Sequence, residues 1–403
     1  MKKENTPYLL VASICLPFAI YFYGMRKRSL TILKFALPSF YGFLGYTLQL
    51  RGSSDAYRAV ENFDSIANNY SFSFFAYAIE KITNFKSEGT EIYYDLVSAI
   101  VSLFSSNFRF FFMFNGIVAG ILVYKIIKTI TDLYPKISRI SLVLISLIAP
   151  PMLMLNGRFW LASVYFILMA LYYINSKQPK YILYSFFSVF IHQGLAIASI
   201  ILILFYFLKD AKKIVFGIFL ISLLYFGSGS QFVENLLTLF SDTIENQIQG
   251  YANIDVEEAK NTVLEARSQN FYIYSLKGTM LHYLILLCFI YFLFLDKLND
   301  PFLNYMILLT ILFFSFYNLT STISSVGARY LRIGSMIGLI PVLIGFARIK
   351  QRYLKIGLIM CISFVYIIEL RLESEQLFAF FPIFGIVQAL IAIPDLTVME
   401  LIK

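Results

Sequence analysis

Residues 177–213 read KQPKYILYSFFSVFIHQGLAIASIILILFYFLKDAKK, and this stretch decides how the chain is arranged. Its apolar part, residues 181–208, has about 28 residues, whereas about 20 helical residues cross the hydrocarbon core of a bilayer. Lysines flank both ends, so a single crossing would place one lysine cluster outside. We therefore predict two half-helices that break at His192-Gln193-Gly194. Irregular backbone at membrane depth needs protein or water as a partner, so we expect His192 to face an outward cavity.

Similar apolar runs recur along all 403 residues, of which 59% are hydrophobic and only 14% are charged. A soluble domain has about 25% charged residues, so water is not the main solvent of this chain. We predict an all-α, polytopic integral membrane protein with a single membrane domain over residues 1–403 and about 11–13 transmembrane or half-membrane helices. The predicted spans are residues 7–24, 30–48, 108–127, 140–156, 159–174, 181–208, 214–227, 279–295, 301–319, 331–347 and 353–370, with a further apolar stretch at residues 377–393.

The basic residues indicate the orientation. If Arg26, Lys27 and Arg28 are cytoplasmic, the segments on that side hold 18 Lys/Arg against 4 Asp/Glu, and the segments outside are richer in acidic residues. This asymmetry follows the positive-inside rule, so the net charge of +9 reflects topology. We expect the lipid bilayer as a partner and no nucleic acid. The predicted location is the bacterial cytoplasmic (inner) membrane, with many passes and an outer N-terminus.

Two extracytoplasmic segments are long enough to be structured. Residues 49–107 form the first, and within it Glu91 to Phe104 is too short to span and reads as an interfacial helix. Residues 228–278 form the second.

Motifs for metals and nucleotides are missing. The sequence contains no Asp-x-Asp motif, no phosphate-binding loop and no dinucleotide fingerprint, and its three cysteines are far apart within apolar runs. We expect neither a metal nor another cofactor, and the pattern argues against a nucleotide-driven machine in the cytoplasm.

Ionisable residues at apolar spans are the candidates for function, since a charge at a helix centre costs about 2.5–3.5 kcal/mol. Arg158 lies at the outer junction of two predicted spans, and His192 at the predicted break. Arg329 and Arg332 are three residues apart, on one face of a helix that we expect to begin at the outer side. Such a pair can bind a phosphate, helped by the field of the helix N-terminus. The alternatives are a snorkelling Arg158, a packing histidine and an interfacial arginine pair.

Between residues 51 and 332, short motifs follow one another in a defined order. They are the cluster Arg51, Gly52, Asp55 and Tyr57, then Glu91-Ile92-Tyr93-Tyr94, Asn107-Phe108, Asn156-Gly157-Arg158 with Leu161-Ala162, Phe190-Ile191-His192, and Arg332. Their order and membrane placement resemble the EpsG/Wzy-like family of polysaccharide polymerases, which includes O-antigen and capsule repeat-unit polymerases. Phe159 departs from the family pattern, which often has Gln there, and so does Gln193-Gly194, where the family has a small or polar pair.

The resemblance implies a GT-C-like fold and a metal-independent membrane glycosyltransferase. Its donor would be a growing glycan on undecaprenyl diphosphate, its acceptor a hydroxyl of the next lipid-linked unit, and its site would face the periplasm or exterior. A chain-length regulator and a flippase are the protein partners that such a system implies. Together, the resemblance and the positions of the charged residues give the expected site: His192, Asp55 and Arg158 as catalytic residues, and Arg51, Glu91, Arg158, Arg329 and Arg332 as substrate-binding residues.

Two other functions stay open. A flippase or transporter of lipid-linked oligosaccharides would bind the same diphosphate, but we would expect repeat symmetry and cations through the membrane depth. The candidate cations here lie near the outer face, which favours the enzyme. An O-antigen ligase uses a similar donor, and the sequence does not separate it from a polymerase.

The topology predicts where reporter fusions work. Alkaline phosphatase is active only outside the cytoplasm, so fusions near Ser54 and Asn253 should be active and fusions near Lys177 and Lys350 silent. Phosphatase activity normalised to fusion abundance is the measurement. The reverse pattern would contradict the orientation and the outward-facing site.

Overall fold

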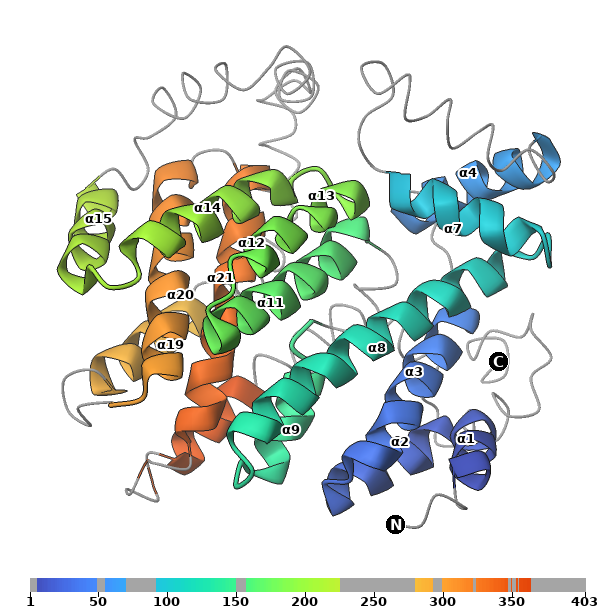
Figure 1. The fold of residues 1–403 in the computed structure, drawn as a ribbon, viewed down its shortest axis with the longest axis horizontal. Helices are drawn as coiled ribbons and strands as arrows, with labels where there is room; N and C mark the ends of the chain where they lie inside the picture. The colour runs from blue at the N-terminus through green and yellow to red at the C-terminus, as the bar shows by residue number, and fades with distance from the viewer. Residues whose placement is uncertain are drawn as a thin grey trace, which may run out of the picture. The chain divides into compact units, whose positions relative to one another are not determined.

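The computed structural model describes residues 6–48, 55–69, 92–149, 157–224, 280–292, 299–321, 324–346, 349, 353 and 355–363. Within these ranges the regular elements are helices and there is no strand, which confirms the all-α, polytopic class (Figure 1). Four described helices are long and apolar enough to cross a membrane. The described residues divide into two compact units, one up to Ser199 and one from Ile200.

The first unit begins with two helices where we predicted a single span at residues 7–24. Helix α1 covers Thr6–Cys15 and α2 covers Pro17–Lys27, with Leu16 between them in a non-helical conformation (φ −134°, ψ 56°). Proline has no N–H to donate and its ring crowds the preceding turn, so it suits the first position of a new helix. The remaining helices of this unit are α3 (Leu30–Tyr46), α4 (Asp55–Asn69), α7 (Ile92–Ser102), α8 (Phe108–Leu133), α9 (Arg139–Ser146), α11 (Arg158–Ser176), α12 (Lys180–Ser185), α13 (Phe187–Ile191) and the start of α14 (Leu195–Leu208).

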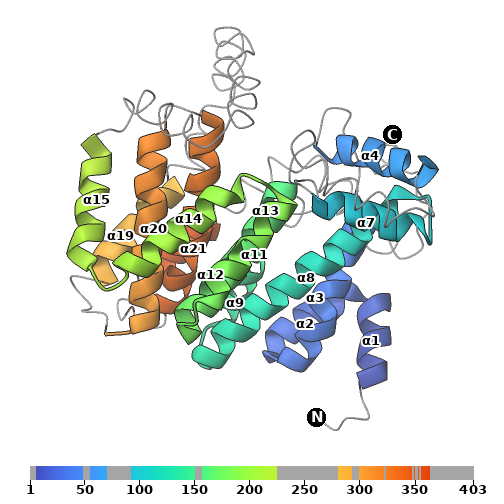
Figure 2. The same cartoon turned by 45° about the horizontal axis from the view of Figure 1, so that its top comes forward.

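Helices α3 and α8 pack backbone to backbone, and they lie side by side in Figures 1 and 2. Glycines make this possible: a methyl group on Gly116 would strike the carbonyl of Tyr41, and one on Gly120 would lie 2.5 Å from the carbonyl oxygen of Leu37. Gly45 meets the backbone of α8 in the same way. Small residues four apart allow this approach, on which helix pairs in lipid rely because apolar burial drives little association there.

Buried tyrosines attach α9 to this pair. The Tyr41 hydroxyl donates to the carbonyl oxygen of Ser146 at 2.6 Å, and the Tyr21 hydroxyl lies 2.6 Å from the Ser146 side-chain oxygen. Both tyrosines are buried, so their hydroxyls need such partners. Ser146 thereby fixes the end of α9 against α2 and α3.

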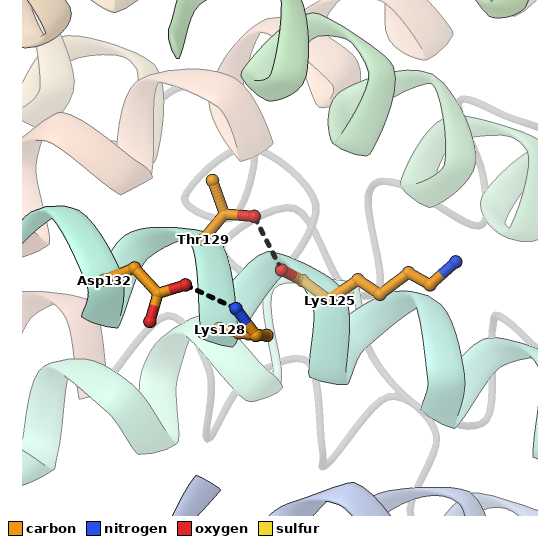
Figure 3. A network of polar contacts seen from close by, with 4 residues as sticks. All are labelled: Lys125, Lys128, Thr129 and Asp132. Atoms are coloured by element: carbon orange, nitrogen blue, oxygen red, sulfur yellow. Dashed lines mark hydrogen bonds and ion pairs between the residues drawn. The ribbon is translucent and has the colours of Figure 1, made fainter. Parts of the chain in front are cut away.

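Helix α8 extends past residue 127, where the predicted span ended, to Leu133. Its last turns carry the polar network of Figure 3, in which Lys128 pairs with Asp132 at 2.5 Å and the Thr129 hydroxyl donates to the carbonyl oxygen of Lys125 at 2.9 Å. Pairs of opposite charge four residues apart support an exposed helix end by about 0.3–0.5 kcal/mol. The helix therefore continues beyond its apolar run.

The predicted break in residues 181–208 is confirmed. Helix α13 ends at Ile191, His192 has extended backbone angles, and α14 starts at Leu195. The Ser185 hydroxyl donates to the Ser199 hydroxyl at 3.1 Å, although a continuous helix would separate residues 14 positions apart by about 21 Å. The chain therefore reverses at His192-Gln193-Gly194. A further small break at Phe186 separates α12 from α13.

The second unit holds α15 (Lys212–Leu224), α19 (Leu281–Ile290), α20 (Pro301–Thr320) and α21 (Ser324–Gly345). Helix α20 contacts α15 and α21, and the Asn318 side-chain amide donates to the Ser222 hydroxyl at 3.0 Å. Helix α21 starts seven positions before the predicted span at residues 331–347. Its Gly338 lets α19 and α20 approach together, since an added methyl would lie 2.8 Å from both Ile285 and Thr310.

The glycine contact predicts opposite effects for two alanine substitutions. Gly116→Ala should destabilise the protein by about 1–3 kcal/mol, because the neighbouring backbone of α3 cannot move away. Gly217→Ala is the matched control: this helical glycine has no atom near its added methyl, so alanine should be neutral or stabilise by about 0.5–1 kcal/mol. Thermal unfolding of the purified variants in detergent is the measurement. Equal stability of the two variants would contradict the close contact.

Candidate functional site

Arg158 is the first residue of α11, and the backbone of Gly157 caps this helix without any side-chain hydrogen bond. Its guanidinium carbon lies 5.8 Å from the centre of the Tyr94 ring, which belongs to α7. The side chain is half-buried. The N-terminus of this 19-residue helix favours anions through its free N–H groups and its dipole. The positive charge of Arg158 adds to this favourable field at the same helix end.

His192 packs against Phe159, the residue after Arg158. The two rings are 5.7 Å apart and nearly perpendicular, at 89°. The His192 backbone N–H donates to the carbonyl oxygen of Ser188, which closes α13 and directs the chain into the turn. Helix α13 also contacts α7 and α11. The structure therefore brings Arg158 and His192, two of the predicted catalytic residues, into one neighbourhood.

Helix α7 supplies the third side of this site. The Tyr94 ring is 5% exposed and packs edge-on against Phe111 of α8, at 5.3 Å and 87°. The next residue, Asp95, is 6% exposed and accepts a hydrogen bond of 2.6 Å from the Asn62 amide of α4. Burial raises the pKa of the neighbouring Tyr93 phenol well above its ordinary value, so this hydroxyl stays protonated. Figure 2 shows α4 lying over α7 at the end of α8.

The remaining predicted site residues have different positions. Arg329 is half-buried and Arg332 exposed, both on α21 of the second unit. Because α21 begins at Ser324, the two arginines lie in its second and third turns, and the field of a helix end falls off within the first turn. The prediction that the field of the helix N-terminus acts at this arginine pair is therefore wrong. The prediction that the two arginines lie on one face of a helix is unchanged, because they are three residues apart within α21. The structure describes Asp55 only as the first residue of α4, and Arg51 and Glu91 lie outside the described residues.

The EpsG family model matches residues 34–383. The chain belongs to the EpsG family. Membership of this family supports a polysaccharide polymerase-like role in general, for a multi-pass membrane protein. Neither the curated proteins nor the solved structures gave a match.

Two residues of this EpsG-family site, Asn62 and Asp95, were not among our sequence candidates. Residues 55–69 lie in the first predicted extracytoplasmic segment, where we predicted a helix only from Glu91; they form α4, whose apolar residues Val60, Phe63 and Ile66 face inward. That spacing is a weak helical signal within a polar sequence. Asp95 was visible as a carboxylate inside an apolar helix, but nothing in the sequence links it to Asn62, 33 positions earlier.

The bond between α4 and α7 predicts a ranking of variants in this EpsG-family protein. Asn62→Ala leaves the buried Asp95 carboxylate without this donor and should destabilise the protein by about 1–3 kcal/mol. Asp95→Asn should cost less, because the new amide oxygen can still accept from Asn62. Asp64→Ala on the exposed face of α4 is the control and should have little effect. Thermal unfolding in detergent measures all three, and an Asn62→Ala variant as stable as the control would argue against the bond.

Proposed function

We propose that this protein polymerises lipid-linked polysaccharide repeat units at the outer face of the cytoplasmic membrane. It would transfer the growing glycan from undecaprenyl diphosphate to a sugar hydroxyl of the next lipid-linked unit. The observation that supports this most is that the His192 ring contacts Phe159, the residue after Arg158, in a chain of the EpsG family. A residue that can bind a diphosphate and a residue that can accept a proton are thus both found at the start of α11.

The proposed reaction forms one bond and breaks one. The acceptor hydroxyl oxygen bonds to the anomeric carbon of the growing chain, the bond from that carbon to the diphosphate oxygen breaks, and the hydroxyl proton passes to a base. Negative charge grows on the leaving diphosphate, which a preorganised cation in a low-dielectric site stabilises. Arg158 has this role in the proposal, together with Arg329 or Arg332, so the positive charge comes from guanidinium groups and the reaction is independent of metal.

The base in this scheme is His192 or Asp55. Histidine is a common general base, and His192 stands at a chain reversal that we expect to face outward. Arg51 and Glu91, in the same predicted outer segment as Asp55, are proposed to bind the substrate sugars.

Arginine at position 158 should matter for its shape as well as its charge. A guanidinium holds two phosphate oxygens in a fixed fork, whereas an ammonium is a point charge, so we expect Arg158→Lys to be impaired and Arg158→Ala more so. Loss of a contact that strengthens in the transition state should cost about 3–4 kcal/mol, or about 100- to 1,000-fold in rate. The assay uses reconstituted protein with lipid-diphosphate repeat units, and product ladders are scored on gels.

Arg139→Lys is the matched control, because Arg139 also opens a helix but lies on the predicted cytoplasmic side. It should polymerise normally, and the abundance of each variant in the membrane is measured alongside. Normal ladders from well-expressed Arg158→Ala would place Arg158 as an interfacial anchor. If the wild-type protein instead moved the lipid-linked unit across the bilayer without extending it, the transporter would be the correct function.

A further inference from the structure

Tyr94, whose ring lies near the Arg158 guanidinium, is more buried than the arginine. Tyr94 is 5% exposed and its ring meets Phe111 edge-on, while Phe111 is fully buried on α8. Phe111 also contacts Phe63 of α4, with ring centres 5.8 Å apart. The buried Tyr94 ring therefore packs against α8, and Phe111 of α8 packs in turn against α4.

Helix α7 depends on its neighbours for its own position. It has only 11 residues, and helices this short are marginal in isolation. The 2.6 Å hydrogen bond from Asn62 to Asp95 ties α7 to α4 at the residue next to Tyr94. Asp95 and Tyr94 are both buried, so a shift of the helix would disturb this bond and the ring contact together.

We propose that Tyr94 is a positioning residue for Arg158, with the Asn62–Asp95 bond holding its helix in place. This inference rests on the proposed function. The guanidinium plane and a ring face attract each other through charge and quadrupole, and the 5.8 Å separation lies within the range of that interaction. An arginine side chain has several rotatable bonds, and ordering them when the substrate binds opposes binding. The ring reduces this loss, because it holds the guanidinium near one place before the diphosphate arrives.

The ring face is the feature that should matter at position 94. Tyr94→Phe keeps the face and should stay within about 2-fold of the wild-type kcat/KM for the lipid-diphosphate donor. Tyr94→Leu keeps apolar bulk without a ring and should lower kcat/KM by about 3- to 30-fold, through a higher KM at the least. Phe104→Leu is the matched control: it removes a ring just beyond the end of the same helix, and because Phe104 is 85% exposed, kcat/KM of the folded protein should be unchanged.

A double-mutant cycle separates positioning from packing. If Tyr94 acts through Arg158, adding Tyr94→Leu to Arg158→Ala should lower the residual rate no further, as measured with radiolabelled donor over long incubations. If Tyr94 only supports the fold, the two losses should multiply. The reconstituted full-length protein is used, and rates are normalised to correctly folded protein.

The outcomes also separate this inference from the proposed function. Normal activity of Arg158→Ala would overturn both. An inactive Arg158→Ala beside a fully active Tyr94→Leu would overturn only the positioning role. Equal impairment of Tyr94→Phe and Tyr94→Leu would assign the effect to the hydroxyl and likewise overturn it. Rescue by Tyr94→Phe, together with a non-additive cycle, is the result that we expect.

Discussion

The first unit depends on the close contact of α3 and α8, in which backbone touches backbone because glycines leave no side chain between them. Within a bilayer, lipid tails are as apolar as leucine, so helices gain by close packing rather than by leaving water. Gly116 and Gly120 provide that packing on α8, and Gly45 on α3. The same two helices then hold other parts: Tyr41 of α3 binds the end of α9, and Phe111 of α8 supports the Tyr94 ring. The α3–α8 pair is thus connected to the candidate site by the contact of Phe111 with Tyr94.

The candidate site joins segments that are distant in sequence, and its described contacts between helices are largely aromatic. The Tyr94 ring lies against Arg158, and Phe159 against His192. The buried Asp95, next to Tyr94, accepts a hydrogen bond from the Asn62 amide. The aromatic contacts thus connect the start of α11 to α7 and to His192, at the turn before α14.

The helical hairpin at His192 explains how an apolar segment long enough to span the membrane can have lysines at both of its ends. Residues 181–208 are long enough for one tilted crossing, but lysines at both ends disfavour it. Ending α13 at Ile191 places extended backbone at His192, and the Ser185–Ser199 bond joins the two arms. The turn sets this histidine beside the start of α11, where a lone histidine in a continuous span would have had no such neighbour.

Hydropathy and charge are local properties of the chain, so the sequence alone determined the all-α membrane class, the helices α3, α11 and α20, the break at His192 and the family.

Contacts between the faces of different helices depend on residues that are far apart in the chain. Pro17 is present in the sequence, yet only the structure shows that the first predicted span is two helices. Helix α4 lies in a polar sequence, and α21 starts at Ser324, before its apolar run, and packs against α20. The pairs Asn62–Asp95 and Tyr94–Arg158 could not be predicted, because their members are far apart in the chain and meet only once α4, α7, α8 and α11 have packed. Gly116 and Gly120 are four residues apart in the sequence, but this spacing does not identify the partner helix, since any helix with small residues could match it. Tertiary packing decided that the partner is α3.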